Sequence, residues 1–137
     1  MIEVCTVRTR QRCELIDVTR EVAEVVRSSG VGEGRVIVFV PHTTAAVTIN
    51  ENADPDVQHD VLLTLAELIP QDRRGYRHGE GNSDAHVKAS LLGSSETILV
   101  QDGRLVLGTW QGIYFAEFDG PRTRQMHVAV SGSSPRP

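Results

Sequence analysis

The last third of the chain, from Glu96 onward, limits the fold more than any other part, because it contains strand-forming segments and no helical pattern. Turn sequences such as Asp102-Gly103 and Asp119-Gly120-Pro121 divide it. The pattern predicts successive antiparallel strands over residues 97–101, 105–107, 113–119 and 124–130. A sheet of mainly antiparallel strands is therefore expected to organise the fold.

The first two thirds of the chain alternate strands with helices. Residues 2–9 and 13–16 are rich in strand formers and predict an opening hairpin around a short polar turn. A helix follows, capped by Asp17 or Thr19 and stopped by Gly30. Its apolar residues recur at helical spacing, namely Val18, Val22, Val25 and Val26.

The middle of the chain predicts two more strands and two more helices. The apolar run 36–40 indicates a strand buried on both faces, and residues 46–49 indicate a shorter strand. Asp54-Pro55 begins a helix, because a capping carboxylate precedes proline at the first helical position. The inward stripe expected for this helix is Val57, Val61, Leu65, Leu68 and Ile69. A third, short helix is expected over residues 83–92.

Strands that alternate with helices early and form a meander late indicate an α+β fold. We expect a mainly antiparallel sheet or sandwich with two longer helices and one short helix. At 137 residues the chain has the usual length of one domain. We place that domain at residues 1–132, followed by a frayed tail over residues 133–137.

Composition restricts the partners that we expect. The formal net charge is -4 and the basic residues are scattered, so no basic face is available to hold nucleic acid by its phosphates. No apolar run approaches the ~20 residues of a membrane span, and the N-terminus lacks a leader pattern. We therefore expect a cytoplasmic protein that binds small solutes and neither nucleic acid nor membranes. Cys5 and Cys13 are expected to stay buried thiols in a reducing cytosol, although a hairpin would let them face each other.

Residues 78–86 concentrate polar groups to a degree that packing does not explain. Two imidazoles, two carboxylates and two glycines occur within nine residues, and neither His78 nor His86 lies in an apolar run. His42 belongs to a second polar island, Pro41-His42-Thr43-Thr44, directly after the strongest strand signal. If the fold joins the two islands, three histidines and several carboxylates converge.

Three imidazoles plus water make an open catalytic zinc geometry, so His42, His78 and His86 are candidate metal ligands. The spacing of His78 and His86 matches no recognised short metal motif, and two other interpretations stay open. The histidines either make hydrogen bonds in turns or bind an anionic substrate as imidazolium. His59 and His127 are expected to be structural.

The loop before residue 83 is a candidate anion site. Gly79, Gly81 and Asn82 either direct backbone N–H groups at a phosphate or form an ordinary flexible loop. Three cations either neutralise a phosphate or lie solvated on the surface, namely Lys88, Arg122 and Arg124. Candidate bases or oxygen ligands are Glu51, Asp54, Glu80 and Asp84, of which Asp54 is also explained by helix capping. Candidate polar groups for a pocket are Gln111 and Glu117.

At these same motifs the chain resembles the YjbQ family, a family of secondary thiamine-phosphate synthases. The matching motifs are residues 41–45 (Pro-His-Thr-Thr-Ala), 50–55 (Asn-Glu-Asn-Ala-Asp-Pro), 78–93 and 108–112 (Gly-Thr-Trp-Gln-Gly). They occur in the family's order, and the likeness covers nearly the whole chain except the last few residues. The resemblance is therefore more specific than any single motif.

The resemblance implies a compact α+β subunit that assembles as a homotrimer, with a polar pocket near the subunit boundary. It implies a weak thiamine-phosphate synthase activity, which joins an aminopyrimidine diphosphate to a thiazole phosphate and releases pyrophosphate. His42, His78 and His86 carry over as a metal or anion site, and the divalent ion expected there is zinc or magnesium.

The first functional hypothesis is an enzyme that acts on a phosphorylated small molecule and offsets charge on the leaving pyrophosphate. The catalytic roles are assigned to His42, Glu80, Asp84 and Lys88. Substrate or anion binding is assigned to Thr44, Gly81, Asn82, Gln111 and Arg122. The second hypothesis is a trimeric module that binds a metal ion or a phosphorylated metabolite without converting it. A purely structural protein would bind nothing at its histidines.

Overall fold

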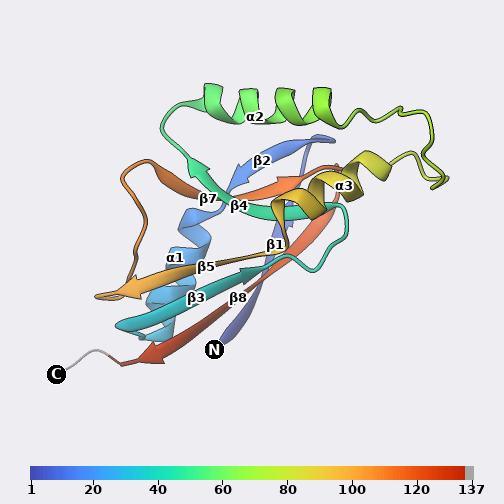
Figure 1. The fold of residues 1–137 in the computed structure, drawn as a ribbon. Coiled ribbons are helices and arrows are strands. Elements are labelled where there is room, and N and C mark those ends of the chain that lie inside the picture. Colours follow the sequence, from blue (N-terminus) through green and yellow to red (C-terminus); the bar gives the residue numbers. More distant parts are fainter. Residues whose placement is uncertain (135–137) are drawn as a thin grey trace.

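Two antiparallel sheets and three helices make up the structure, a computed structural model that describes residues 1–134 (Figure 1). The strands are β1 (Ile2–Arg8), β2 (Glu14–Asp17), β3 (Glu33–Phe39), β4 (Ala45–Glu51), β5 (Ser95–Gln101), β6 (Arg104–Leu105), β7 (Gln111–Glu117) and β8 (Thr123–Ser133). The helices are α1 (Thr19–Ser29), α2 (Pro55–Leu68) and α3 (Ser83–Leu92). The sheets have the orders β1-β8-β3-β5-β6 and β2-β7-β4. The predicted α+β class with mainly antiparallel strands and three helices is confirmed.

The first two strands do not form the predicted hairpin, because they belong to different sheets. β1 pairs with β8, whereas β2 pairs with β7. The connection lacks the Asn-Gly or Asp-Gly of a tight hairpin, and its backbone N–H groups at Arg10 and Gln11 donate to the Glu14 carboxylate instead, at 2.6 and 2.8 Å. The chain therefore crosses between the sheets, and Cys5 and Cys13, which a hairpin would have brought together, are both free.

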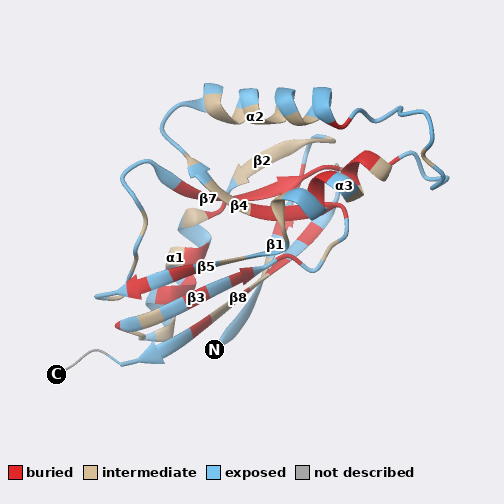
Figure 2. Ribbon diagram, in the orientation of Figure 1, coloured by how far each residue is buried: buried red, intermediate tan, exposed pale blue. Residues whose placement is uncertain are grey.

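Helix α1 packs against both sheets and supplies one side of the main core. Its valines at positions 22, 25 and 26 are buried, as their spacing predicted. The helix ends at Gly30, whose φ of +73° is the left-handed conformation that glycine adopts without strain. Figure 2 shows burial along β7 and β4, at the start of α3, on one side of α1 and at alternate residues of the larger sheet.

The larger sheet buries only one of its two faces. Val36 and Val38 of β3 are fully buried, but Ile37 and Phe39, which alternate with them along the strand, are 37% and 43% exposed. The predicted burial of this strand on both faces is therefore wrong, because an antiparallel sheet commonly leaves one side uncovered. The pairing places further apolar side chains on the same side. We call this surface the outer apolar face, and its exposed members are Ile2, Val4, Ile37, Phe39 and Leu99.

Helix α2 lies along the smaller sheet but is only partly packed against it (Figure 1, Figure 2). It begins as predicted, since the Asp54 side chain accepts a hydrogen bond from the Asp56 N–H at 2.9 Å and Pro55 is the first helical residue. None of its residues is fully buried, and Leu68 of the predicted inward stripe is 72% exposed. The apolar stripe of α2 is thus only partly covered by the rest of the chain.

Helix α3 has the bounds that the sequence predicted, and it packs beside β4. Its buried residues are two alanines and two charged side chains, Asp84 and Lys88. Strand β8 continues through Ser133, and residues 135–137 of the predicted frayed tail lie outside the described part of the chain. No helix within residues 1–134 is long and apolar enough to cross a membrane.

Candidate functional site

His42 and His86 come from separate elements and line one surface pocket. His42 lies in the loop between β3 and β4, and His86 lies in the first turns of α3. The pocket has a volume of about 470 Å³, and its other lining residues are small or polar, among them Thr43, Ala45, Ala89, Ser90 and Ser94. The fold therefore brings the two polar islands of the sequence together.

His78 stands beside this pocket and contacts His86. Their ring centroids are 5.4 Å apart with the ring planes at 89°, and His78 Nε2 lies 3.6 Å from Glu80 Oε2. Within residues 1–134, however, no group of three or more His, Cys, Asp or Glu side chains is arranged to hold a metal ion. The three histidines lie near one another without forming a ligand set.

The hydrogen bonding of His42 determines where its proton lies. Its Nε2 accepts a hydrogen bond from the Gln125 backbone N–H at 3.0 Å, so the neutral ring carries its proton on Nδ1. Burial of the ring, and next the positive charge of Arg124, lower the pKa of His42. The ring is therefore neither a ready imidazolium nor a free metal ligand, and the predicted three-histidine metal site does not fit its geometry.

A buried ion pair lies behind His42. Arg124 Nε and Nη2 donate to the two carboxylate oxygens of Glu117, at 2.9 and 2.5 Å, and both side chains are almost completely buried. Arg124 Nη2 also donates to Thr44 Oγ1 at 2.8 Å. Thr44 is itself buried. Its predicted role in substrate binding does not fit, because its hydroxyl oxygen is engaged inside the protein.

Glu117 has its hydrogen-bonding capacity filled. The Thr9 hydroxyl donates to Oε1 at 2.8 Å, and the backbone N–H groups of Phe118 and Asp119 donate to Oε2, each at 3.0 Å. Burial alone raises the pKa of this carboxyl group. The hydrogen bonds from Arg124, from a backbone N–H and from Thr9 outweigh burial, so the pKa of Glu117 is lowered and the group is an anion.

A second buried carboxylate, Asp84, lies on the inner side of α3. Arg12 Nη2 donates to Oδ1 at 2.9 Å, while Lys88 Nζ and Arg12 Nη1 donate to Oδ2 at 2.9 and 3.1 Å. Burial raises the pKa of Asp84, but the hydrogen bonds from Arg12 and Lys88 outweigh it and lower the pKa. A fully buried, ion-paired carboxylate is a poor base, so its predicted catalytic role does not fit. Lys88, also predicted to be catalytic, is buried in this cluster.

The start of α3 differs from the predicted anion site. Asn82 Nδ2 donates to Asp119 Oδ2 at 2.8 Å, and its Oδ1 is buried without a partner among residues 1–134. A free acceptor oxygen repels an anion. Gly81 has a φ of +72°, and its carbonyl accepts a hydrogen bond from Gln71 Nε2. Of the residues predicted to bind an anion here, Arg122 alone offers an exposed cation, which is paired with Asp119 at 2.9 Å.

Gln111 lies at the far end of β7 from the pocket. The register pairs Gln111 with Glu51 and Glu117 with Ala45, so at ~3.4 Å per residue the two ends of β7 are about 20 Å apart. The Gln111 Oε1 accepts a hydrogen bond from the Gly108 N–H at 2.8 Å. The structure therefore does not bring Gln111 to the His42 pocket within one chain.

Sequence reasoning underrated the residues that back the pocket. Arg124 is in phase with Met126, Val128 and Val130, which all point inward, and a charged residue at an inward position of a strand is a usable signal. Arg12 has no such signal, because it lies in an irregular connection and its partner is 72 residues away.

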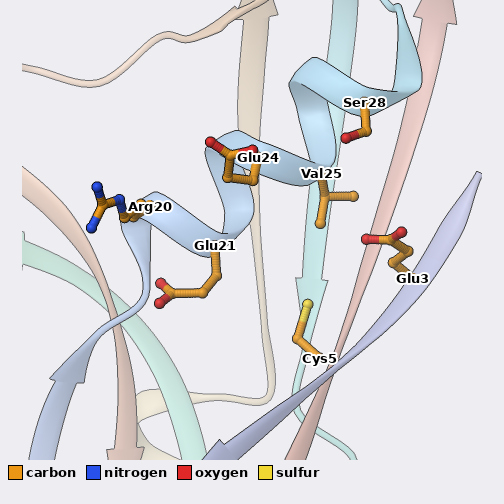
Figure 3. Close-up of a pocket in the computed structure, with 7 residues that line it drawn as sticks. All are labelled: Glu3, Cys5, Arg20, Glu21, Glu24, Val25 and Ser28. Atoms are coloured by element: carbon orange, nitrogen blue, oxygen red, sulfur yellow. The ribbon is translucent and has the colours of Figure 1, made fainter.

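A second groove, between β1 and α1, has a different character (Figure 3). Its volume is about 310 Å³, and Glu3 and Cys5 of β1 face Glu21 and Glu24 of α1 across it. Burial, followed by the charges of Glu3 and Glu21, raises the pKa of the Cys5 thiol. A protonated thiol among carboxylates is a poor nucleophile and does not attract anions. The His42 pocket is the stronger candidate for a functional site.

The fold and the site together define a class of protein: a small α+β protein with two antiparallel sheets and a histidine-lined pocket backed by buried ion pairs. The model of a family described as "UPF0047 protein YjbQ-like" matches residues 3–133. The chain belongs to this UPF0047/YjbQ family, so the resemblance seen in the sequence is confirmed.

Relatives from bacteria and archaea match over nearly their full length. The chain is 48% identical to UPF0047 protein YugU of Bacillus subtilis, over 96% of this chain and 100% of that protein. It is 52% identical to UPF0047 protein MJ1081 of Methanocaldococcus jannaschii, over 92% and 91%. A crystal structure of an uncharacterised family member from Clostridium acetobutylicum shares 51% identity and a TM-score of 0.92, covering 94% of this chain and 99% of that one. These names establish the family and state no activity.

Proposed function

We propose that the His42 pocket binds and converts a phosphorylated small molecule, and that the reaction is a weak thiamine-phosphate synthase activity. The observation that supports it is the meeting of His42 and His86 at one pocket with buried cations behind it. The Asp84 cluster contains one carboxylate and two cations, so it leaves a net positive charge under α3. Fixed positive charge and oriented donors favour the oxygens of a bound phosphate.

In this reaction the thiazole nitrogen forms a bond to the methylene carbon of the aminopyrimidine. The bond from that carbon to the diphosphate oxygen breaks, and pyrophosphate leaves with the electron pair. The protein has to hold both substrates in line and stabilise the charge that develops on the leaving group. His86 and Ser90 contact the substrate from α3, and Glu80, beside His78, accepts a hydrogen bond from the aminopyrimidine amine.

The predicted zinc or magnesium ion stays a prediction, and no step of the proposed reaction depends on it. His78 and His86 remain candidate ligands because their rings are adjacent. His42 does not, because its Nε2 lone pair already accepts a hydrogen bond from the backbone.

A turnover assay with the purified protein tests this function, with pyrophosphate and thiamine phosphate both quantified. We expect His86→Ala to lower kcat/KM at least about tenfold, which corresponds to ~1.4 kcal/mol of transition-state stabilisation. His59→Ala is the matched control, because His59 is an exposed histidine on α2. No product from the parent protein, or unchanged turnover in folded His42→Ala and His86→Ala variants, would overturn the proposal.

The second candidate function is a non-catalytic homotrimeric module that binds a metal ion or a phosphorylated metabolite. The outer apolar face favours self-association, because monomers rarely expose so many large apolar side chains side by side. Saturable binding of inorganic pyrophosphate, with no product after long incubation with both substrates, would favour this module over the enzyme. Sedimentation at micromolar protein tests the trimer, and a monomeric mass would exclude it.

A further inference from the structure

We propose that His42 is a neutral hydrogen-bond donor, which presents its Nδ1–H to an oxygen of an anionic ligand in the pocket and does not bind a metal ion. This role rests on the proposed function of the pocket and names the protein atom that recognises the ligand. It also removes one of the three predicted metal ligands.

At one end of the larger sheet, the His42 side chain hydrogen-bonds to β8 where β3 no longer pairs with it. The pairing of β3 with β8 stops at Phe39 and His127, and beyond that point β8 pairs with β1 alone. The Gln125 N–H lies in this stretch of β8 and donates to His42 Nε2 at 3.0 Å. The imidazole therefore supplies the acceptor that a longer β3 would have supplied.

Only one neutral tautomer is compatible with this hydrogen bond. If Nε2 carried the proton, the ring N–H and the strand N–H would point at each other. A doubly protonated ring would create the same conflict. Backbone N–H groups in folded proteins are almost always paired, so the geometry selects a ring with a lone pair on Nε2 and a proton on Nδ1.

Neighbouring side chains prevent the backbone of β8 from moving away from His42. Arg124 is held by two hydrogen bonds to Glu117 and by two to Thr44, one to its hydroxyl and one to its backbone carbonyl. Met126, on the other side of Gln125, is fully buried. The donor that fixes the tautomer is therefore part of the rigid core, and Arg124 and Glu117 are positioning residues for the ring.

The second ring nitrogen of His42, Nδ1, determines which class of ligand the ring can bind in the pocket. His42 lines the pocket, and its Nδ1 makes no hydrogen bond to any residue in the range 1–134. An N–H donor recognises an acceptor, and phosphate or pyrophosphate oxygens are strong acceptors. A metal ion would need a lone pair, which Nδ1 lacks and which Nε2 already shares with the strand. The pocket side of His42 is thus suited to an oxyanion.

Nitrogen-15 NMR of the full-length protein, labelled at histidine and at the backbone, tests the tautomer directly. We expect the Nε2 resonance of His42 in the range of an unprotonated ring nitrogen and the Nδ1 resonance in the protonated range. A scalar coupling across the hydrogen bond should connect Nε2 to the Gln125 amide, which also assigns the ring without any variant. The measurement needs no turnover, so a failure of the synthase activity leaves it intact.

Two titrations then separate an oxyanion ligand from a metal ligand. Inorganic pyrophosphate is expected to shift the His42 Nδ1 resonance saturably. Stoichiometric zinc is expected to leave both His42 nitrogens unchanged, whatever it does to His78 and His86. A protonated Nε2, a zinc-induced shift of His42 to the metal-bound range, or an Nδ1 resonance that pyrophosphate does not move would each overturn the proposal.

Discussion

The buried carboxylates Glu117 and Asp84 are stabilised in different ways. Glu117 faces one cation, Arg124, and a hydroxyl and two backbone N–H groups fill its remaining capacity. Asp84 faces two cations, Arg12 and Lys88, and within residues 1–134 it accepts from no backbone group. The first cluster is therefore electrically balanced, whereas the second has one positive charge in excess.

The position of each cluster in the fold explains this difference. Glu117 lies in β7 of the smaller sheet and Arg124 in β8 of the larger one, so their ion pair joins the two sheets. Asp84 attaches α3 to the connection between β1 and β2. The comparison indicates that Glu117 joins the two sheets, whereas the Asp84 cluster holds α3 to the rest of the chain and keeps an excess positive charge buried beneath that helix.

Glu117→Ala is expected to have the largest effect on stability. It leaves the guanidinium of Arg124 buried without its counter-charge, which typically costs about 3–5 kcal/mol in free energy of unfolding. Urea unfolding followed by circular dichroism measures the loss. The matched control is Glu24→Ala, because Glu24 forms an exposed pair with Arg27 that is worth at most about 1 kcal/mol. Equal stability of the two variants would contradict the scaffold role.

Asp84→Ala is expected to cost somewhat less, about 2–4 kcal/mol, because one of its two cations can relax. Arg12 is 31% exposed, so its guanidinium can be hydrated when it loses the carboxylate. Adding Lys88→Met should recover part of the loss by removing the unpaired buried ammonium. The double-mutant cycle is measured by urea unfolding. A double variant less stable than Asp84→Ala alone would show that Lys88 has another stabilising partner.

The sequence predicted the elements whose signals are local. Helix α3 has the expected bounds, α2 begins at the Asp54-Pro55 signal, and α1 stops at Gly30, because caps and turn residues act within a few positions of themselves. The assignment of β1 and β2 to different sheets depends on partners far along the chain, and no local signal specifies it.

The same distinction applies to the site. The two polar islands of the sequence marked the region around His42 and His86, and these two residues do line one pocket. The roles within it depended on distant contacts: His42 meets an amide 83 residues away, and Asp84 meets Arg12 72 residues away. Composition and spacing contain no information about such pairings. Asp84 and Lys88 were therefore predicted to be pocket residues, whereas the structure buries both.

Acid should weaken the scaffold cluster, and Glu117→Gln should remove part of that dependence. The pKa of Glu117 is lowered below its unfolded value of about 4.3, because hydrogen bonds to the anion outweigh burial. A lowered pKa contributes stability above the unfolded value, and the contribution is lost as pH falls through the folded pKa. The urea midpoint, followed from neutral pH to about pH 3, should therefore fall less steeply in Glu117→Gln. If the urea midpoints of the parent and of Glu117→Gln fell in parallel with pH, groups other than Glu117 would be responsible for the acid sensitivity.

Thr44→Val is expected to have the smallest effect, about 1 kcal/mol, because Arg124 keeps both hydrogen bonds to Glu117 when it loses the hydroxyl acceptor. Thr9→Val should cost more, since the Thr9 hydroxyl donates to Glu117 and also accepts the Arg122 N–H at 2.8 Å. Urea unfolding measures both, with Thr64→Val on exposed α2 as the control. If Thr44→Val were as costly as Glu117→Ala, Thr44 would have to be a main support of the guanidinium, and the balanced pair would no longer explain how the sheets are joined.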